Sequence, residues 1–102
     1  MNFFYADSQL DDELIEAAED GDIMNVKEFI KKGADVNAKD NDYGWTALMH
    51  ASIYGHKEIV EILISNKADV NAKDNDDFTA LMYASREGHK EIVEILKKAG
   101  AK

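Results

Sequence analysis

The stretch ADVNAKDND occupies residues 34–42, and the same word recurs at residues 68–76, 34 positions later. Each copy is followed by Thr-Ala-Leu-Met, by Ala-Ser and by GHKEIVEIL, which lies at 55–63 and again at 88–96. These later words are offset by 33 positions, because the segment before the threonine is one residue longer in the first copy. A period of this size indicates one supersecondary unit stacked on itself. Such a stack has a long contact surface and no evident chemical machinery, so the period favours a binding protein.

The composition bounds the class of protein. With 102 residues, the chain has room for one domain with a modest core. Its 45% hydrophobic content is that of a folded chain, and no apolar run approaches the ~18–20 residues of a membrane-spanning helix. The opening MNFFYADSQ has neither the basic start nor the apolar stretch of a signal peptide, so we expect a cytoplasmic protein. Cysteine is absent, which excludes disulfides and thiolate metal sites.

The charge balance is acidic, with 21 Asp and Glu against 12 Lys and Arg and a net charge of −9. Proteins that bind nucleic acids or anionic membranes need clustered basic residues, so neither kind of partner is expected. A protein partner with a basic face would be steered towards this chain. The alternative, which the sequence leaves open, is that the charge only keeps the protein soluble.

Each unit predicts two helices that meet at a glycine. Thr46 can cap the first helix, whose apolar residues continue at helical spacing as far as Gly55. A second helix is predicted over about 56–66. Residues 79–88 and 89–98 repeat this pair, and the polar ADVNAKDND words predict projecting loops, between which the sequence permits short bridges. The apolar stripe of the second helix consists of Ile59, Val60, Leu63 and Ile64.

A first, more divergent unit is in register with the other two. Asp12 takes the place of Thr46, and Gly21 separates the two helices. We therefore predict a tail over 1–10 and a repeat domain over 11–102, with about the minimum number of units that stabilises a stack. The repeats span about 11–43, 44–76 and 77–102. The apolar residues of the first unit are Leu14, Ile15, Ala17, Ala18, Val26, Phe29 and Ile30.

The words GADVNA, D-x-G-x-T-A-L-Met and GH-x-EIV-x-IL resemble the ankyrin repeat, a β-turn followed by two antiparallel helices. The resemblance covers roughly residues 11–102. It implies an all-α solenoid, a slightly curved stack of helix pairs with hairpin-like loops on one side. It also implies recognition of proteins through the loop tips and through the concave face formed by the first helices.

Some positions depart from the family pattern. The loop glycine survives as Gly44, and Lys67 occupies the place where Gly33 and Gly100 end their helices, so we expect a left-handed backbone at Lys67. The replacements are Ala47 and Ala80 for the usual proline, Met49 and Met82 for the usual histidine, Asp77 for a loop glycine and Lys67 for a terminal glycine.

The ends of the array turn polar. Asn25 in the first unit and Lys97 in the last replace isoleucines of the other units, which suits helices that no further unit covers. On this pattern we expect a complete array that acts as a monomer. Phe3, Phe4 and Tyr5 belong to no repeat, and they either fold back over the first unit or form a tail that a partner binds.

The histidines predict no metal site. His56 and His89 belong to the repeat word and are expected to have a structural role at helix starts. His50 is the remaining histidine, and its counterparts Glu16 and Tyr83 supply no ligand set for zinc. The DNDY and DNDD loop tips concentrate carboxylates, but they lack the ligand ladder of a calcium loop.

Residues for catalysis or cofactor binding are also not evident. Ser52 and Ser85 are expected at small core positions, without the His–Asp register of a nucleophilic enzyme. Glycine-rich phosphate loops are absent from the sequence. We therefore expect neither an enzyme nor a cofactor.

Variation between the units indicates the binding surface. Positions where the units agree build the scaffold, and positions where they differ carry aromatic and apolar groups, the usual anchors of an interface. The predicted partner-binding residues are Tyr43, Trp45, His50, Ile53, Tyr54, Asp76, Phe78, Tyr83 and Arg86. Tyr83 is predicted to be central. The alternative for Trp45 and Phe78 is packing against neighbouring loops.

The expected function is an adaptor or scaffold that binds a protein partner through its loop tips and concave face. The alternative is an inhibitor or regulatory subunit that occludes the active site of an enzyme or transporter. A third interpretation is a structural scaffold without a partner.

Overall fold

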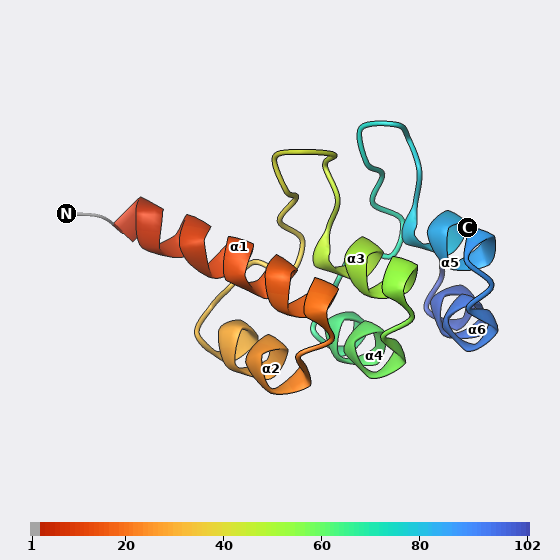
Figure 1. Ribbon diagram of the computed structural model, residues 1–102, viewed down its shortest axis with the longest axis horizontal. Helices are drawn as coiled ribbons and strands as arrows, with labels where there is room; N and C mark the ends of the chain where they lie inside the picture. Colours follow the sequence, from red (N-terminus) through yellow and green to blue (C-terminus); the bar gives the residue numbers. More distant parts are fainter. Residues whose placement is uncertain (1–2) are drawn as a thin grey trace.

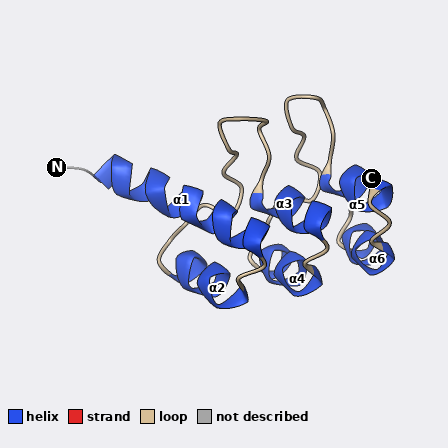
Figure 2. Ribbon diagram, in the orientation of Figure 1, coloured by secondary structure: helices blue, strands red, loops and turns tan. Residues whose placement is uncertain are grey.

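The computed structural model describes residues 3–102, with side chains from residue 9 onward. Within this part, six helices follow one another in antiparallel pairs (Figure 1). They are α1 (Phe3–Asp20), α2 (Ile23–Lys31), α3 (Ala47–Tyr54), α4 (Lys57–Ser65), α5 (Ala80–Arg86) and α6 (Lys90–Lys98). Two rows result: α1, α3 and α5 lie next to the projecting loops, and α2, α4 and α6 lie on the far side (Figure 1). Figure 2 shows helices and loops only along the described chain, which confirms the predicted all-α solenoid.

The helix starts follow from the threonines of the repeat word. The hydroxyl of Thr46 accepts a hydrogen bond from the Met49 N–H at 3.2 Å, and Thr79 does the same for Met82 at 3.3 Å. Each bond satisfies a backbone donor that the first turn of a helix leaves without a partner. Gly55 ends α3 with a left-handed backbone, at φ 77°. The predicted caps and the predicted break are confirmed.

His56 and His89 immediately precede α4 and α6, as predicted, but their side chains do not cap these helices. The Nε2–H of His56 donates to the carbonyl of Glu19 at 3.0 Å, and that of His89 donates to Ile53 at 2.9 Å. Each histidine thereby bonds to the unit before its own. The turn glycine of that unit makes room for the ring, since a Cβ on Gly55 would lie 2.8 Å from His89.

The core lies between the two rows and continues from unit to unit. Small alanines on α1, α3 and α5 let the next helix approach, and branched residues on α2, α4 and α6 fill the space between pairs. The most deeply buried residues are Leu14, Ala18, Val26, Ala47, Leu48, Met49, Ala51, Ile59, Val60, Leu63, Ala84 and Leu96. The predicted stripe on α4 faces this core, with Ile64 only partly buried.

The first helix differs from the prediction. The backbone is helical from Phe3, so Asp12 lies inside α1 instead of at its start. The physical reason is that no glycine or proline interrupts the chain between Phe3 and Asp20. The side chains of Phe3, Phe4 and Tyr5 lie outside the described residues. Neither α1 nor any other helix of residues 3–102 is long and apolar enough to cross a membrane.

The last unit corrects one core assignment. Ser52 is fully buried beneath the next unit, but Ser85, its counterpart on α5, is exposed. The reason is that α3 packs against α5, whereas no further helix of the described chain lies beyond α5. Asn25 and Lys97 are exposed, as predicted for the two ends of the array.

Candidate functional site

Two loops project from the same side of the stack and carry the predicted tips (Figure 1). The first loop comprises residues 32–46, and the second comprises residues 66–79. A backbone bond from the Asn75 N–H to the Tyr43 carbonyl joins them at 3.0 Å, and the Lys39 ammonium donates to the Lys73 carbonyl at 2.7 Å. These bonds hold the two loops side by side. The isolated β-bridge of the described chain, between Lys39 and Thr46, lies within the first loop and not between the loops.

Asp40 organises the first loop from inside. Its Oδ1 accepts the backbone N–H groups of the turn, including those of Tyr43 at 2.9 Å and Gly44 at 3.0 Å. Its Oδ2 lies 3.0 Å from Nε2 of His50 on α3. One carboxylate thus closes the turn and ties the loop to the helix that follows it.

Asp74 has the same role in the second loop. Its Oδ1 accepts the N–H groups of Asp76 at 2.8 Å and Phe78 at 2.9 Å. Its Oδ2 accepts the Tyr83 hydroxyl and, at 2.9 Å, the indole N–H of Trp45 from the first loop. Asp74 therefore joins two loops and α5.

These networks change the pKa values of their members. Burial raises the pKa of Asp40, but hydrogen bonds from Tyr43 and His50 outweigh it, so this pKa lies below the ordinary 3.8. The pKa of Asp74 also lies below 3.8, because hydrogen bonds, first that of Tyr83, outweigh its burial. Burial and the bond to Asp74 raise the pKa of Tyr83 to about 12.

Several predicted partner-binding residues are accessible on the loop side. Tyr43, Tyr54 and Phe78 are large rings with exposed fractions of 57%, 49% and 40%. Asp76 and Arg86 are also exposed, and Ile53 is half-buried. A surface of this kind contains the aromatic and arginine groups that anchor protein interfaces.

His50 and Tyr83 correct the predicted surface, because they are buried, with exposed fractions of 6% and 4%. The Tyr83 ring packs edge-on against Trp45 at 5.5 Å and Phe78 at 5.6 Å, and the guanidinium of Arg86 lies 5.0 Å from its centre. Trp45 is partly buried and bonds to the second loop, which is the packing alternative considered for it. The central residue of the predicted contact surface is thus a support for the exposed rings around it.

A groove of about 540 Å³ lies between α1, α3 and the first loop. We refer to it as the first groove. Its α1 wall carries carboxylates, and its opposite walls carry aromatic rings. The lining residues are Asp12, Ile15, Glu16, Glu19, Asp40, Asp42, Tyr43, Trp45, His50 and Tyr54. Four of the predicted partner-binding residues, Tyr43, Trp45, His50 and Tyr54, therefore come together here.

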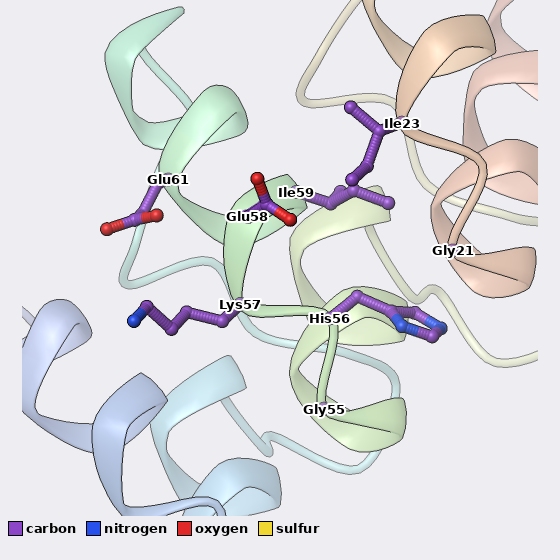
Figure 3. A pocket seen from close by; sticks show the side chains of 8 residues that line it. All are labelled: Gly21, Ile23, Gly55, His56, Lys57, Glu58, Ile59 and Glu61. Carbon is purple, nitrogen blue, oxygen red and sulfur yellow. The ribbon is translucent and has the colours of Figure 1, made fainter.

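A second cleft, of about 630 Å³, lies where α4 begins (Figure 3). In Figure 3 the His56 ring reaches towards the turn at Gly21, and Ile23 and Ile59 lie close together. A matching cleft at the start of α6 is lined by His89 and by the counterparts of the other lining residues of the α4 cleft, except that of Glu61. Since the cleft recurs with the repeat, we assign it to the packing of successive units.

Sequence reasoning missed Asp40 and Asp74. Each is the last residue of an ADVNAKD word. The same acidic residue thus occurs at the same position of two loops, and this repetition is a signal that could have identified both aspartates. The α1 carboxylates of the first groove were not predicted as a site, because Asp12 and Glu16 were considered only as the counterparts of Thr46 and His50. Their shared wall becomes evident only when α1 and the first loop are placed together.

Comparison with known proteins agrees with this geometry. The family model described as ankyrin repeats matches residues 14–102, in three copies. A 56-residue stretch, 55% of the chain, is 41% identical to 8% of the 2-5A-dependent ribonuclease of Mus musculus. A 52-residue stretch, 51% of the chain, is 44% identical to 6% of the ankyrin repeat and SAM domain-containing protein 6 of Rattus norvegicus. A 58-residue stretch, 57% of the chain, is 41% identical to 8% of the mitochondrial disaggregase of Homo sapiens.

The chain thus matches less than a tenth of the length of each of these relatives. Their named activities belong to much larger proteins and are not carried over. What the matches share is the repeat array, a non-catalytic fold for contacts between proteins.

Proposed function

This chain belongs to the ankyrin repeat family, and we propose that it is an adaptor whose protein partner docks on its concave face and loop tips. The concave face is the exposed side of α1, α3 and α5 together with the facing sides of the two loops. The partner is a protein with a basic docking surface, and the chain binds it as a monomer. The net charge of −9 supports a basic partner, because it would accelerate encounter with a positive surface.

The exposed rings Tyr43, Tyr54 and Phe78 carry this proposal. They lie on the loop side of the stack and are between 40% and 57% exposed, although a scaffold alone would not require them. Behind them Trp45, Asp74 and Tyr83 form a buried hydrogen-bonded cluster that restrains the loop tips. Rigid supports lower the entropy that a surface loses on binding, which favours recognition of a partner.

Site-specific photo-crosslinking tests the face. A photoreactive amino acid replaces Tyr54 in one variant and Lys57 in another, and crosslinked proteins are identified by mass spectrometry. Tyr54 lies on α3, whereas Lys57 begins α4 in the other row of helices. We expect one partner to be captured from Tyr54 and not from Lys57.

Alanine variants then measure the contact with that partner. Tyr43→Ala, Tyr54→Ala and Phe78→Ala should weaken binding, with a cost of about 1–3 kcal/mol at one or two of them. Lys57→Ala and Lys90→Ala are the controls, since both lysines are exposed. If the lysine variants weaken binding and the variants of the aromatic residues do not, the interface lies on the second helices and the proposal is wrong.

The acidic tips should act on the rate of association. Asp42, Asp76 and Asp77 are exposed, and their charges are screened by salt. Asn variants should lower the association rate and its salt dependence more than they change dissociation. Unchanged association rates at low salt would remove the support for a basic partner.

A further inference from the structure

We infer that the first groove takes a lysine or arginine side chain from a basic segment of the partner. The inference rests on the proposed function, because it names the chemistry of the partner at one place on the concave face. The groove combines a wall of carboxylates with aromatic rings, and it has a volume of about 540 Å³. This volume is enough for one long side chain and part of its backbone.

The α1 wall is strongly negative. Asp12, Glu16 and Glu19 follow one another at a spacing that places them on one face of the helix, and all three are exposed. None of them forms an ion pair with a basic residue of the described chain, and neither lysine nor arginine lines the groove. Three neighbouring like charges repel one another, and a cation from a partner would relieve this repulsion.

The opposite walls are aromatic, which is an independent observation in favour of a cation. The rings of Tyr43 and Trp45 are 4.9 Å apart and inclined at 37°, and Tyr54 is half exposed at the end of α3. The faces of such rings attract ammonium and guanidinium groups, most strongly when water is excluded. Aliphatic stems of lysine and arginine also pack well against aromatic surfaces.

His50 lies beneath the same groove and holds one of its loop carboxylates. Its side chain is more than nine-tenths buried and lines the groove, and its Nε2 contacts Asp40. Nδ1 has no hydrogen-bond partner in the described chain. When Nε2 donates to Asp40, Nδ1 is an acceptor, but this atom is buried beneath the groove and does not itself contact the cation.

The next unit shows that the fold does not require these charges. Thr46 at the cap of α3, and His50 and Ile53 within it, occupy the positions that Asp12, Glu16 and Glu19 occupy on α1. The same helix pair therefore forms without the carboxylates. Their presence in the first unit alone is a property of this groove and is not a property of the repeat.

The carboxylates are too dispersed to bind a metal ion. No three acidic or histidine side chains of the described residues converge closely enough to form a metal site. Negative charge distributed along a helix instead suits an extended cationic side chain, or two such side chains from one segment. A nucleic acid is disfavoured by the same negative charge.

The test uses the intrinsic fluorescence of Trp45, which lines the groove and is the single tryptophan of the chain. The probes are short Gly/Ser peptides that carry several arginines, lysines or citrullines at the same positions. Citrulline keeps the shape of arginine but lacks the charge. We expect the arginine or the lysine peptide to change the Trp45 emission with saturation, and the citrulline peptide to leave it unchanged. The stronger of the two basic peptides then identifies the preferred side chain.

Matched variants separate the groove from the overall charge. The double variant Glu16→Gln and Glu19→Gln should lower the affinity for the basic peptide roughly fivefold to tenfold. Glu61→Gln and Glu94→Gln remove the same charge from exposed positions on α4 and α6 and should have no comparable effect. The inference would be overturned if both double variants lost affinity equally or if the citrulline peptide bound. It would also be overturned if neither basic peptide changed the Trp45 emission with saturation.

The natural partner distinguishes this inference from the proposed function. Binding that needs Tyr54 and Phe78 but tolerates Glu16→Gln and Glu19→Gln would leave the concave face as the interface and exclude the cation in the groove. Binding that instead depends on Lys57 and Lys90 would refute the proposed function itself.

Discussion

Lys67 has a left-handed backbone with φ of 72°, although it is not a glycine. Gly33 and Gly100 have positive φ values at the equivalent positions, of 104° and 102°, so the repeat imposes this conformation. A left-handed backbone costs an L-residue about 1–2 kcal/mol, because its Cβ crowds the carbonyl that follows. The backbone expectation drawn from the repeat pattern is confirmed, and it leads to a stability prediction.

Lys67→Gly should stabilise the protein by roughly 0.5–1 kcal/mol. The relief of strain exceeds the extra chain entropy that glycine loses on folding, which is about 0.5–1 kcal/mol. Urea denaturation should show a higher midpoint and an unchanged slope. Gly33→Ala is the matched control and should lower the midpoint, since nothing lies within 4 Å of its added Cβ and only strain acts. A lower midpoint for Lys67→Gly would mean that the lysine side chain contributes a contact of its own.

Tyr83 should titrate abnormally late. Its pKa is raised from 10.0 to about 12 by burial and by the bond to Asp74. A folded pKa above the unfolded value gives stability that is fully present below pH 10 and is lost as the pH rises towards 12. In the absorbance of tyrosinate, one of the four tyrosines should ionise near pH 12, and Tyr83→Phe should remove that step. Ionisation of every tyrosine near pH 10 would show that the Tyr83–Asp74 bond is absent in solution.

The helices are short and depend on their neighbours. Apart from α1, each has seven to nine residues, below the length at which an isolated helix is stable in water. Threonine caps start α3 and α5, but packing between successive pairs supplies most of their stability. A helix without a neighbour on one side must therefore keep that side compatible with water, and α6, the last helix of the described residues, does so with Lys97 exposed.

Lys97→Leu should turn α6 into an interior helix without a neighbour. The change adds an apolar side chain to the outer face of the last unit, and such a patch promotes association. Sedimentation velocity at increasing concentration should show more self-association in the variant than in the unchanged protein. A variant that stays monomeric and becomes more stable would mean that Lys97 is covered in solution.

The array is held together by contacts that recur between units. His56 bonds to the first unit and His89 to the second, each against a turn glycine. The side chain of Asn37 accepts the Asp69 N–H at 2.7 Å, which ties the two loop bases together in the same way. Stability is therefore divided between the units and the interfaces that join them.

Gly55→Ala and Gly88→Ala should separate these two contributions. Both glycines have nearly the same left-handed backbone, with φ of 77° and 78°, so alanine causes the same strain. At Gly55 the new Cβ would lie 2.8 Å from the His89 ring, whereas nothing lies within 4 Å at Gly88. In urea denaturation, Gly55→Ala should therefore lower the free energy of unfolding by about 1 kcal/mol more than Gly88→Ala, because it displaces the hydrogen bond from His89 to the Ile53 carbonyl. Equal losses would show that this histidine does not couple the units.

The repeat period was sufficient for the architecture. The repeated words at residues 46–49 and 55–63, and again at 79–82 and 88–96, predict helix pairs, their caps and their breaks, because local chemistry decides each of these features. Thr46 accepts the N–H three residues later, and Gly55 has the backbone that ends the helix. The early start of α1 was not predicted, since the first unit was aligned to the threonine of the others and the helical run before Asp12 was read as a tail.

The sequence by itself therefore determined the fold, the polar ends and the side of the stack that carries variable rings. Only the tertiary structure decided which of those rings are accessible. Tyr83 and Tyr54 have the same chemistry and both lie on first helices, but Asp74 and Trp45 bury one and leave the other exposed. The first groove could not be predicted from the sequence either, because it joins α1 to loop residues that begin at Asp40, well after the end of α1 at Asp20. Burial depends on such distant neighbours, and no local pattern encodes them.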